Sequence, residues 1–344
     1  MRRVAGFVLF IILIGVIGAG AWLYTTVDHP YKGYAEAETF VEIPQGAGPA
    51  SIGRRLVEAG VVRSRSSFRL ALWLSRAGRR LQAGEYRFDH PMSPRQVIDK
   101  IARGDVYVRA ITFPEGLTVK QMAALYETRG FGSTQDFIAA SRNIALISGL
   151  DPEAPDLEGY LFPDTYTLPR KATAAQLVTR MVASFEKALT PEIRQQALAR
   201  GMGVRQLVTL ASIVEKETGK PEERPLVAAV YSNRLRIGMP LQCDPTVIYA
   251  LDRMGHYNGN LTRADLQLDS PYNTYRHAGL PPGPIASPGR ASLAAAAAPA
   301  DASYLYFVSR NDGSHVFAST LDEHNRNVQE FQVKYFNDRR KVRN

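Results

Sequence analysis

Leu210-Ala-Ser-Ile-Val-Glu-Lys-Glu-Thr-Gly219 is the stretch that decides how this chain is organised. Projected at about 100° per residue, its apolar side chains fill one broad arc of a helix. Glu217 lies inside that arc, Glu215 lies near its other edge, and Lys216 points to the opposite side. We expect a helix over residues 204–218, with Gly219 as its C′ residue and Pro221 as its stop.

Glu217 is expected to have a raised pKa. It lies in the last helical turn, where the negative end of the helix macrodipole disfavours an anion. Apolar surroundings disfavour the same anion, and a carboxyl that keeps its proton near neutral pH can act as a general acid. The alternative is an ordinary last-turn glutamate, solvated or paired with a neighbouring Lys or Arg.

Composition limits the class of protein. The chain has 344 residues, enough for two or three modest domains, and an ordinary apolar fraction of 45%. Its single cysteine, Cys243, excludes an intramolecular disulfide, and its six histidines show no spacing typical of a metal site. We therefore expect no metal and no cofactor. The net charge of +9 is compatible with nucleic acid, anionic lipid or an acidic polymer as a partner.

The N-terminus argues against nucleic acid. After Met1-Arg-Arg3 an uncharged run extends to about Thr26, long enough to cross a bilayer, with residues 4–24 in the membrane. Arg2 and Arg3 predict a cytoplasmic N-terminus, and Trp22 then marks the outer interface. A cleaved signal peptide is the alternative, but its apolar run is usually about 7–15 residues. Either way, the bulk of the chain lies outside the cytoplasm.

The fold class expected from the sequence is α+β, with a membrane anchor over residues 1–27 and three parts after it. A strand, a Pro-x-Gly turn and a helix occur at Val41-Glu-Ile-Pro-Gln-Gly46 and again at Ile111-Thr-Phe-Pro-Glu-Gly116. This pattern resembles the LysM type of glycan-binding module, although the usual Gly-Asp-Thr is absent, and strand–turn–helix is also a common unit. We place LysM-like units in residues 28–108 and 109–190, the second with a connecting region, and a larger mixed domain in residues 191–344.

Asp156-Leu-Glu-Gly-Tyr-Leu-Phe-Pro-Asp-Thr-Tyr166 is dense in aromatic and acidic side chains. Such a mixture suits sugar binding, because rings cover the apolar face of a pyranose and carboxylates accept hydroxyl protons. The alternative is a buried aromatic strand or turn that ends at Pro163.

The C-terminal third contains further motifs. Asp244 is expected to cap a helix over residues 246–251, with Pro245 at its first position. Residues 279–289 alternate Pro and Gly with Leu280 and Ile285, which indicates a rigid, shaped loop. Asn311-Asp-Gly313 predicts a β-hairpin turn, and a final basic helix is expected from His324.

Five segments together resemble the endolytic murein transglycosylase family, also called YceG-like. The segments are Ala211-Ser-Ile-Val-Glu-Lys-Glu-Thr218, Asn233-Arg-Leu-Arg-Ile-Gly-Met239, Leu241-Gln-Cys-Asp-Pro-Thr-Val-Ile-Tyr249, Tyr272-Asn-Thr-Tyr275 and Gly279-Leu-Pro-Pro-Gly-Pro-Ile285. The resemblance covers nearly the whole chain, in the family's order. Cys243 departs from it, because a Thr or similar residue is common there.

The resemblance implies cleavage of peptidoglycan glycan strands, with Glu217 as the acid/base. It implies an enzyme of the cell inner membrane with a periplasmic catalytic domain in residues 191–344, and a role beside the peptidoglycan synthases. We expect substrate to contact the polar motif residues Glu158, Glu215, Asn233, Arg234, Asp244, Tyr272 and Asn273. A hydrolase of the muramidase type and a non-catalytic wall-binding protein are the alternatives.

Glu215 and Glu217 diverge by about 160° around the helix, at about 100° per residue, so they cannot form a close pair. Retaining glycosidases need two carboxyls about 5–5.5 Å apart, and inverting ones about 6.5–9.5 Å. A mechanism with one acid therefore fits better. We expect Glu215 to be structural, paired with Arg234 or Lys216.

Overall fold

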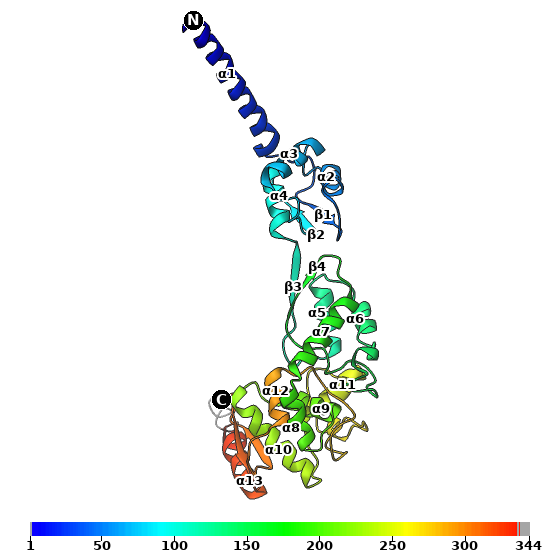
Figure 1. The fold of residues 1–344 in the computed structure, drawn as a ribbon. Helices are drawn as coiled ribbons and strands as arrows, with labels where there is room; N and C mark the ends of the chain where they lie inside the picture. Colours follow the sequence, from blue (N-terminus) through cyan, green and yellow to red (C-terminus); the bar gives the residue numbers. More distant parts are fainter. Residues whose placement is uncertain (1, 336, 338–344) are drawn as a thin grey trace. The chain divides into compact units, whose positions relative to one another are not determined.

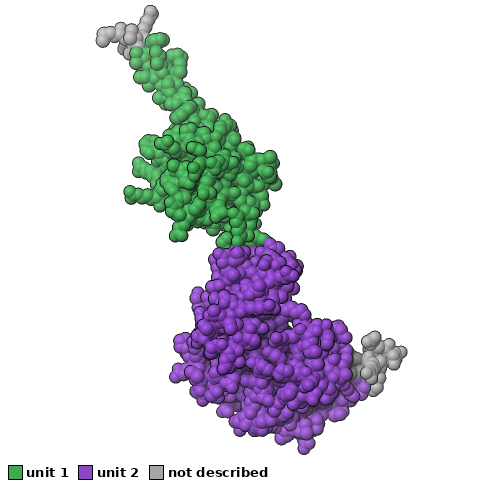
Figure 2. Space-filling model, turned by 90° about the vertical axis from the view of Figure 1, so that its right-hand side faces the viewer, with its two compact units in different colours: residues 1–109, 167–171 green, residues 110–166, 172–344 purple. Residues whose placement is uncertain are grey.

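The computed structural model describes residues 2–335 and 337. These residues form a mixed α+β protein that is mostly helical and contains three small sheets of two strands each (Figure 1). The expected α+β class is confirmed at this level. The chain divides into two compact units, coloured separately in Figure 2. Unit 1 comprises residues 1–109 and 167–171, and unit 2 comprises residues 110–166 and 172–344.

Two paired strands carry the chain between the units. Strand β3 (Val108–Thr112) enters unit 2, and β4 (Thr165–Pro169) returns to unit 1. The domain boundary expected after residue 108 lies at the start of β3, where the chain passes from unit 1 to unit 2. The expected boundary after residue 190 separates α7 from α8, two helices of the same unit.

Unit 1 contains the N-terminal helix and a small α+β body. Its other elements besides β3 and β4 are α1 (Arg2–Leu23), a π-helical turn (Tyr24–Asp28), β1 (Thr39–Ile43), α2 (Pro49–Glu58), α3 (Arg65–Ser75), β2 (Gly84–Phe88) and α4 (Pro94–Arg103). Strands β1 and β2 are antiparallel, with Val41 opposite Tyr86. Among the described residues, one helix is long and apolar enough to cross a membrane, over Gly6–Asp28 with a mean hydropathy of 2.5. It is consistent with a single anchor or a signal sequence.

The end of the apolar helix is built into the core of this body. Val27 is fully buried in the same cluster as Phe68 and Tyr86. The next residue, Asp28, accepts a hydrogen bond of 2.6 Å from Nε of Arg95 on α4. Since burial and an ion pair act on neighbouring residues, the end of the helix is fixed to the body that follows it.

The internal repeat seen in the sequence has the same local backbone in both copies. Gly46 and Gly116, which end the two Pro-x-Gly turns, have φ values of +77° and +76°, a conformation that glycine adopts without a steric penalty. Each turn leads to a ten-residue helix, α2 or α5 (Val119–Thr128). A second helix with a serine cap then follows each of them, namely α3 or α6 (Thr134–Ala140). In both copies the strand before the turn pairs with the strand after the second helix.

Unit 2 is mainly helical. After α5 and α6 its elements are a 3₁₀ turn (Ile144–Ile147), α7 (Ala174–Ala188), α8 (Pro191–Ala199), α9 (Val204–Glu217), a 3₁₀ turn (Pro221–Glu223), α10 (Arg224–Arg236), α11 (Asp244–Arg253), a 3₁₀ turn (Asp265–Gln267), α12 (Arg290–Ala297), β5 (Tyr306–Ser309), β6 (His315–Ala318), α13 (Leu321–Val328) and a π-helical turn (Gln329–Lys334). The expected hairpin is confirmed: β5 and β6 are antiparallel. The last helix begins at Leu321, because Thr320 caps it by accepting a hydrogen bond from the backbone of Glu323, so the start expected at His324 is corrected.

Helix α9 lies in the middle of unit 2 and packs against α8, α10, α11 and α12. All eight residues from Leu207 to Val214 are buried. The loop at residues 279–289 is ordered against this helix, since the N–H of Ile285 donates to Oγ of Ser212 at 3.0 Å. The loop has no regular secondary structure, and its expected rigidity stays a prediction.

Candidate active site

Glu217 is the last residue of α9. Thr218 leaves the helix with extended backbone angles of φ −138° and ψ 133°. Gly219 stands at the expected C′ position, but it does not adopt the left-handed conformation usual there. The helix ends instead because the Thr218 side chain is fixed: its hydroxyl donates to Oε2 of Glu223 at 3.1 Å and accepts from the N–H of Lys220 at 3.1 Å.

The hairpin supports this helix end through Glu223. The backbone N–H of His315 donates to Oε1 of Glu223 at 2.8 Å, and its ring Nδ1 lies 2.7 Å from Oε2. Burial raises the pKa of Glu223, but hydrogen bonds from His315 and Thr218 outweigh burial and hold that pKa below its usual value. Glu223 is therefore a charged acceptor that ties β6 to the residue after Glu217.

Two donors converge on one oxygen of Glu217. The hydroxyl of Tyr231, on α10, donates to Oε1 at 2.7 Å. The thiol of Cys243, directly before α11, donates to the same oxygen at 3.0 Å. Tyr231 is 2% exposed and Cys243 is fully buried, whereas Glu217 is partly exposed. Oε1 is thus held from two neighbouring elements, and the hydrogen bonds found for Glu217 leave Oε2 available.

The environment favours the protonated form of Glu217. Burial raises the pKa of its carboxyl by more than the hydrogen bonds from Cys243 and Tyr231 lower it, and the nearby charge of Asp244 adds to the rise. The pKa of Tyr231 is raised by burial and by the neighbouring Cys243 and Glu217, and the pKa of Cys243 by burial and by Glu217. Both groups keep their protons near neutral pH and so remain donors. The raised pKa expected from sequence agrees with this geometry.

Asp244 and Tyr275 form an exposed pair beside the buried cluster. The Tyr275 hydroxyl donates to Oδ1 of Asp244 at 2.5 Å, and burial and Asp244 raise the pKa of Tyr275. Asp244 is the first residue of α11, and Cys243 is the N-cap, so the expected capping register is corrected by one position. The Asp244 side chain is therefore directed to Tyr275 and solvent rather than used as a cap.

Glu215 points to the other side of α9, as its helical angle predicts. Its Oε1 accepts from Nη2 of Arg224 at 3.0 Å. Its Oε2 accepts from the N–H of Gly289 at 2.9 Å and from Oγ of Ser292 at 2.7 Å. The partner is therefore Arg224, at the start of α10, and the expected pairing with Arg234 or Lys216 is wrong. Lys216 instead donates to the carbonyl of Gly116.

Three of the polar motif residues are engaged with backbone carbonyls. Nδ2 of Asn233 donates to Ala302 and Tyr304, and Nη1 and Nε of Arg234 donate to Leu241 and Leu305. Nδ2 of the fully buried Asn273 donates to Leu266 and Leu268 within its own loop. Their amide and guanidinium donors bind the segment just before β5, the segment just before α11 and the loop before Tyr275. Those donors are occupied by the protein itself, and the expected contact of these side chains with substrate stays a prediction.

Glu158 and Tyr272 belong to a separate cluster with Tyr249 and Arg253. Oε1 of Glu158 accepts from the N–H of Val119, at the start of α5, at 3.1 Å, and the Tyr249 hydroxyl lies 3.4 Å from Oε2. Burial raises the pKa of Glu158 to about 8. The Tyr249 and Tyr272 rings lie 5.0 Å apart, and the Arg253 guanidinium lies over both. Of the site residues predicted from the sequence, Asp244 lies near Glu217. Glu158 and Tyr272 lie near each other in the separate cluster.

Sequence reasoning did not identify Tyr231, Tyr275 or Arg224 as site residues. Tyr231 and Arg224 lie on a helix without an amphipathic pattern, so no periodicity marks them. A tyrosine within the apolar run Pro225–Ser232 was the available signal, because a buried phenol needs a hydrogen-bond partner. Within residues 2–335 and 337, no group of three His, Cys, Asp or Glu side chains is placed to hold a metal ion.

A family model described as the YceG-like family matches residues 41–330. The chain belongs to the YceG-like family. The match contains every residue of the cluster around Glu217.

The chain is also similar to proteins named endolytic murein transglycosylase. The protein of that name from Bacillus subtilis (strain 168) is 33% identical over 327 residues, covering 90% of this chain and 89% of the relative. The one from Streptococcus pneumoniae serotype 2 (strain D39 / NCTC 7466) is 30% identical, covering 95% of this chain and 64% of that longer protein. A crystal structure of a yceG-like protein from Listeria monocytogenes superposes with a TM-score of 0.57 at 32% identity, covering 85% of this chain and 99% of that one.

Proposed function

We propose that this YceG-like protein is a lytic transglycosylase that cleaves the bond between N-acetylmuramic acid and N-acetylglucosamine within peptidoglycan strands. The observation that carries the proposal is the carboxyl of the partly exposed Glu217, which ends a helix, is held through one oxygen and has a pKa raised by burial. The names of the relatives supply the substrate class. No water and no metal are required by the reaction.

The proton of Glu217 belongs on Oε2. Because Oε1 already accepts hydrogen bonds from Tyr231 and Cys243, it is the poorer position for a proton. Oε2 then donates its proton to the glycosidic oxygen, and the bond from C1 of the muramoyl residue to that oxygen breaks. The N-acetylglucosamine leaves with a new hydroxyl, and the muramoyl C1 becomes oxocarbenium-like.

The same carboxyl completes the reaction as a base. The Glu217 carboxylate removes the proton of the muramoyl C6 hydroxyl, and that oxygen attacks C1 and closes a 1,6-anhydro ring. Glu217 regains its proton, so the enzyme returns to its starting state. Tyr231 and Cys243 stabilise the intermediate carboxylate, since their hydrogen bonds lower its pKa. Asp244 and Tyr275, at the exposed side of the cluster, are placed to orient the sugar.

The remaining parts of the chain fit this activity. We propose that α1 is an uncleaved inner-membrane anchor with a cytoplasmic N-terminus and that the rest of the chain is periplasmic. The two strand–turn–helix units of LysM-like pattern would hold glycan near the site, and cleavage would end the elongation of nascent strands beside the synthases. The apolar span Gly6–Asp28 and the matching turns at Gly46 and Gly116 support these assignments.

Product analysis tests the reaction class. The full-length protein in detergent is incubated with purified peptidoglycan, and the soluble products are analysed by mass spectrometry. A transglycosylase gives anhydro-muramoyl ends that resist borohydride reduction. Products that are one water heavier and reducible would identify a hydrolase, and the absence of any product would favour a non-catalytic wall-binding protein.

A further inference from the structure

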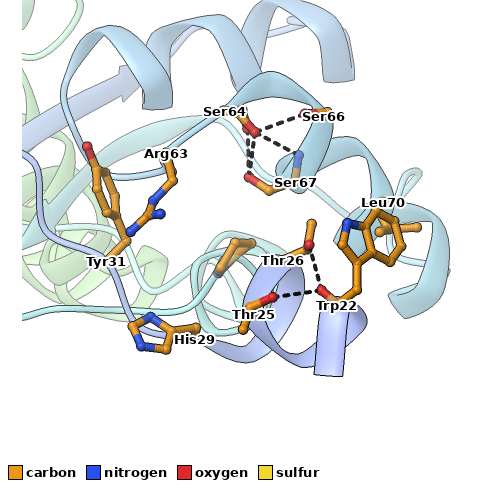
Figure 3. A pocket seen from close by; sticks show the side chains of 11 residues that line it. Trp22, Thr25, Thr26, His29, Tyr31, Arg63, Ser64, Ser66, Ser67 and Leu70 are labelled. Carbon is orange, nitrogen blue, oxygen red and sulfur yellow. Dashed lines mark hydrogen bonds between the residues drawn. The ribbon is translucent and has the colours of Figure 1, made fainter. Parts of the chain in front are cut away.

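A pocket of about 530 Å³ lies in unit 1 where the apolar helix ends and α3 begins (Figure 3). Arg63 and Tyr31 lie on one side of it, and Trp22 and Leu70 lie on the other. The hydroxyls of Ser64, Ser66 and Ser67 come from the first turn of α3 and the residue before it. The Ser64 hydroxyl caps α3 by accepting from the N–H of Ser67 at 3.1 Å, and the Ser67 hydroxyl donates to the Ser64 carbonyl at 2.8 Å. The pocket therefore combines the Arg63 cation with the capped N-terminus of α3, beside the end of the apolar helix.

These groups suit a phosphate. The Arg63 guanidinium lies 5.3 Å from the centre of the Tyr31 ring, which orients it without neutralising its charge. A guanidinium and the N-terminus of an eleven-residue helix both favour an anion with several acceptor oxygens. His29 lines the same pocket. Phosphate esters are common biological anions, and each has several oxygens that accept hydrogen bonds.

The surface next to the pocket is strongly basic. Between residues 59 and 84 the chain contains no Asp or Glu but has six arginines, namely Arg63, Arg65, Arg69, Arg76, Arg79 and Arg80. All six are exposed, and none takes part in a salt bridge found among residues 2–335 and 337. Arg65, Arg69 and Trp73 recur every four residues, so they share one face of α3.

Two exposed tryptophans lie beside this basic surface. Trp22 ends the apolar helix and is 61% exposed, and Trp73 on α3 is 75% exposed. Tryptophan is enriched at the level of lipid headgroups. Because Val27 is buried in the body and Asp28 is paired with Arg95, α3 is held at a fixed position next to the helix end.

We propose that α3 lies on the anionic membrane surface and that the pocket between Trp22 and Arg63 binds the phosphate of a phospholipid headgroup. This inference rests on the proposed anchoring of α1, since the anchor sets the pocket at headgroup level. An acidic glycan strand would also attract arginines. Lipid is favoured because the basic residues adjoin the apolar span and carry an exposed indole on the same helix face.

The experiment uses the full chain reconstituted into vesicles. The chain has two tryptophans, so Trp22→Phe leaves Trp73 as the sole emitter. Quenching of Trp73 by phospholipids with brominated acyl chains is measured in phosphatidylcholine alone and in phosphatidylcholine with phosphatidylglycerol. We expect stronger quenching with phosphatidylglycerol and its loss at high salt. Each arginine removed should lower the ratio of docked to undocked α3 about fivefold.

The decisive variant is Arg63→Ala/Arg65→Ala/Arg69→Ala, which should abolish the difference between the two vesicle types. Its matched control is Arg200→Ala/Arg263→Ala/Arg290→Ala, three exposed arginines of unit 2, which should retain it. In parallel, native mass spectrometry of the detergent-solubilised chain should show phosphatidylglycerol retained by the control and lost by Arg63→Ala. Inorganic phosphate is added as the soluble competitor.

Equal quenching in both vesicle types, or unchanged quenching in the decisive variant, would overturn the proposal. So would retention of phosphatidylglycerol by Arg63→Ala at the level of the control. Release of the chain by alkaline carbonate would overturn the anchor and this proposal with it. Cleavage of solubilised glycan strands should be the same in both triple variants, so a failure of the proposed catalysis is observed separately.

Discussion

The hydroxyl of Tyr231 lies 2.7 Å from Oε1 of Glu217, the same oxygen that the thiol of Cys243 contacts at 3.0 Å. This shared acceptor explains how one carboxyl can serve first as an acid and then as a base. Burial raises the pKa of Glu217 and so favours its protonated form, and the two donors limit the cost of the anion once the proton has been transferred.

Removing a donor should raise the pKa of Glu217 further. In Tyr231→Phe and Cys243→Ala, the alkaline limb of the kcat/KM profile should move to higher pH, because hydrogen bonds from both residues lower that pKa. The rate should also fall roughly tenfold or more, as the anion loses a charge-assisted hydrogen bond. Cys243→Ser keeps a donor and should restore the wild-type profile. An alkaline limb that stays in place in both variants would show that Glu217 does not set it.

Arg224 should matter for stability. Its ion pair with Glu215 is buried, with side chains 9% and 5% exposed. Arg224→Ala leaves a buried, unpaired carboxylate and should cost about 3–5 kcal/mol of unfolding free energy. The double variant Arg224→Ala/Glu215→Gln should recover part of this loss. Denaturant unfolding of wild type, Arg224→Ala, Glu215→Gln and the double variant gives the coupling energy, and additive losses would mean that the pair does not couple.

Glu158 should make the protein less stable as pH rises. Its folded-state pKa of about 8 lies above the ordinary glutamate value of 4.5, so the folded state binds the extra proton between those two values. Unfolding free energy should therefore decline from about pH 4.5 to about pH 8, by at most about 1.4 kcal/mol per pH unit, and then level off.

Glu158→Gln removes this dependence while keeping an oxygen for the N–H of Val119. The stability of wild type relative to this variant should fall across that pH range in denaturant titrations. Glu222→Gln, at an exposed position, is the control and should leave the slope unchanged. A wild-type protein that gains stability relative to Glu158→Gln as pH rises would reverse the assignment.

Much of the local structure follows from the sequence, because it depends on residues close in the chain. The apolar spacing of residues 204–218 predicts α9, and the divergence of Glu215 from Glu217 is a property of any helix. Asn311-Asp-Gly313 similarly predicts the hairpin, since Asn311 and Gly313 both adopt positive φ values.

Contacts between side chains of different helices and loops could not be predicted in the same way. The angle of Glu215 identifies its face, but Arg224 was not identified because it comes from the packing of α10. Asn233, Arg234 and Asn273 stand in family motifs, and the structure uses their donors on backbone carbonyls. The motif alone does not show which backbone carbonyls these side chains bind. Nor could the sequence show that Cys243 lies against Glu217.

The role of Glu217 is the central claim, and it is tested by the rate of anhydro-muramoyl end formation in Glu217→Gln. The full-length variant is compared with wild type and with Glu222→Gln on purified peptidoglycan, after matching thermal unfolding shows that all three are folded. We predict a loss of about 10²–10⁴-fold in Glu217→Gln alone, the range expected when a general acid–base is removed. Full activity in Glu217→Gln would contradict the account.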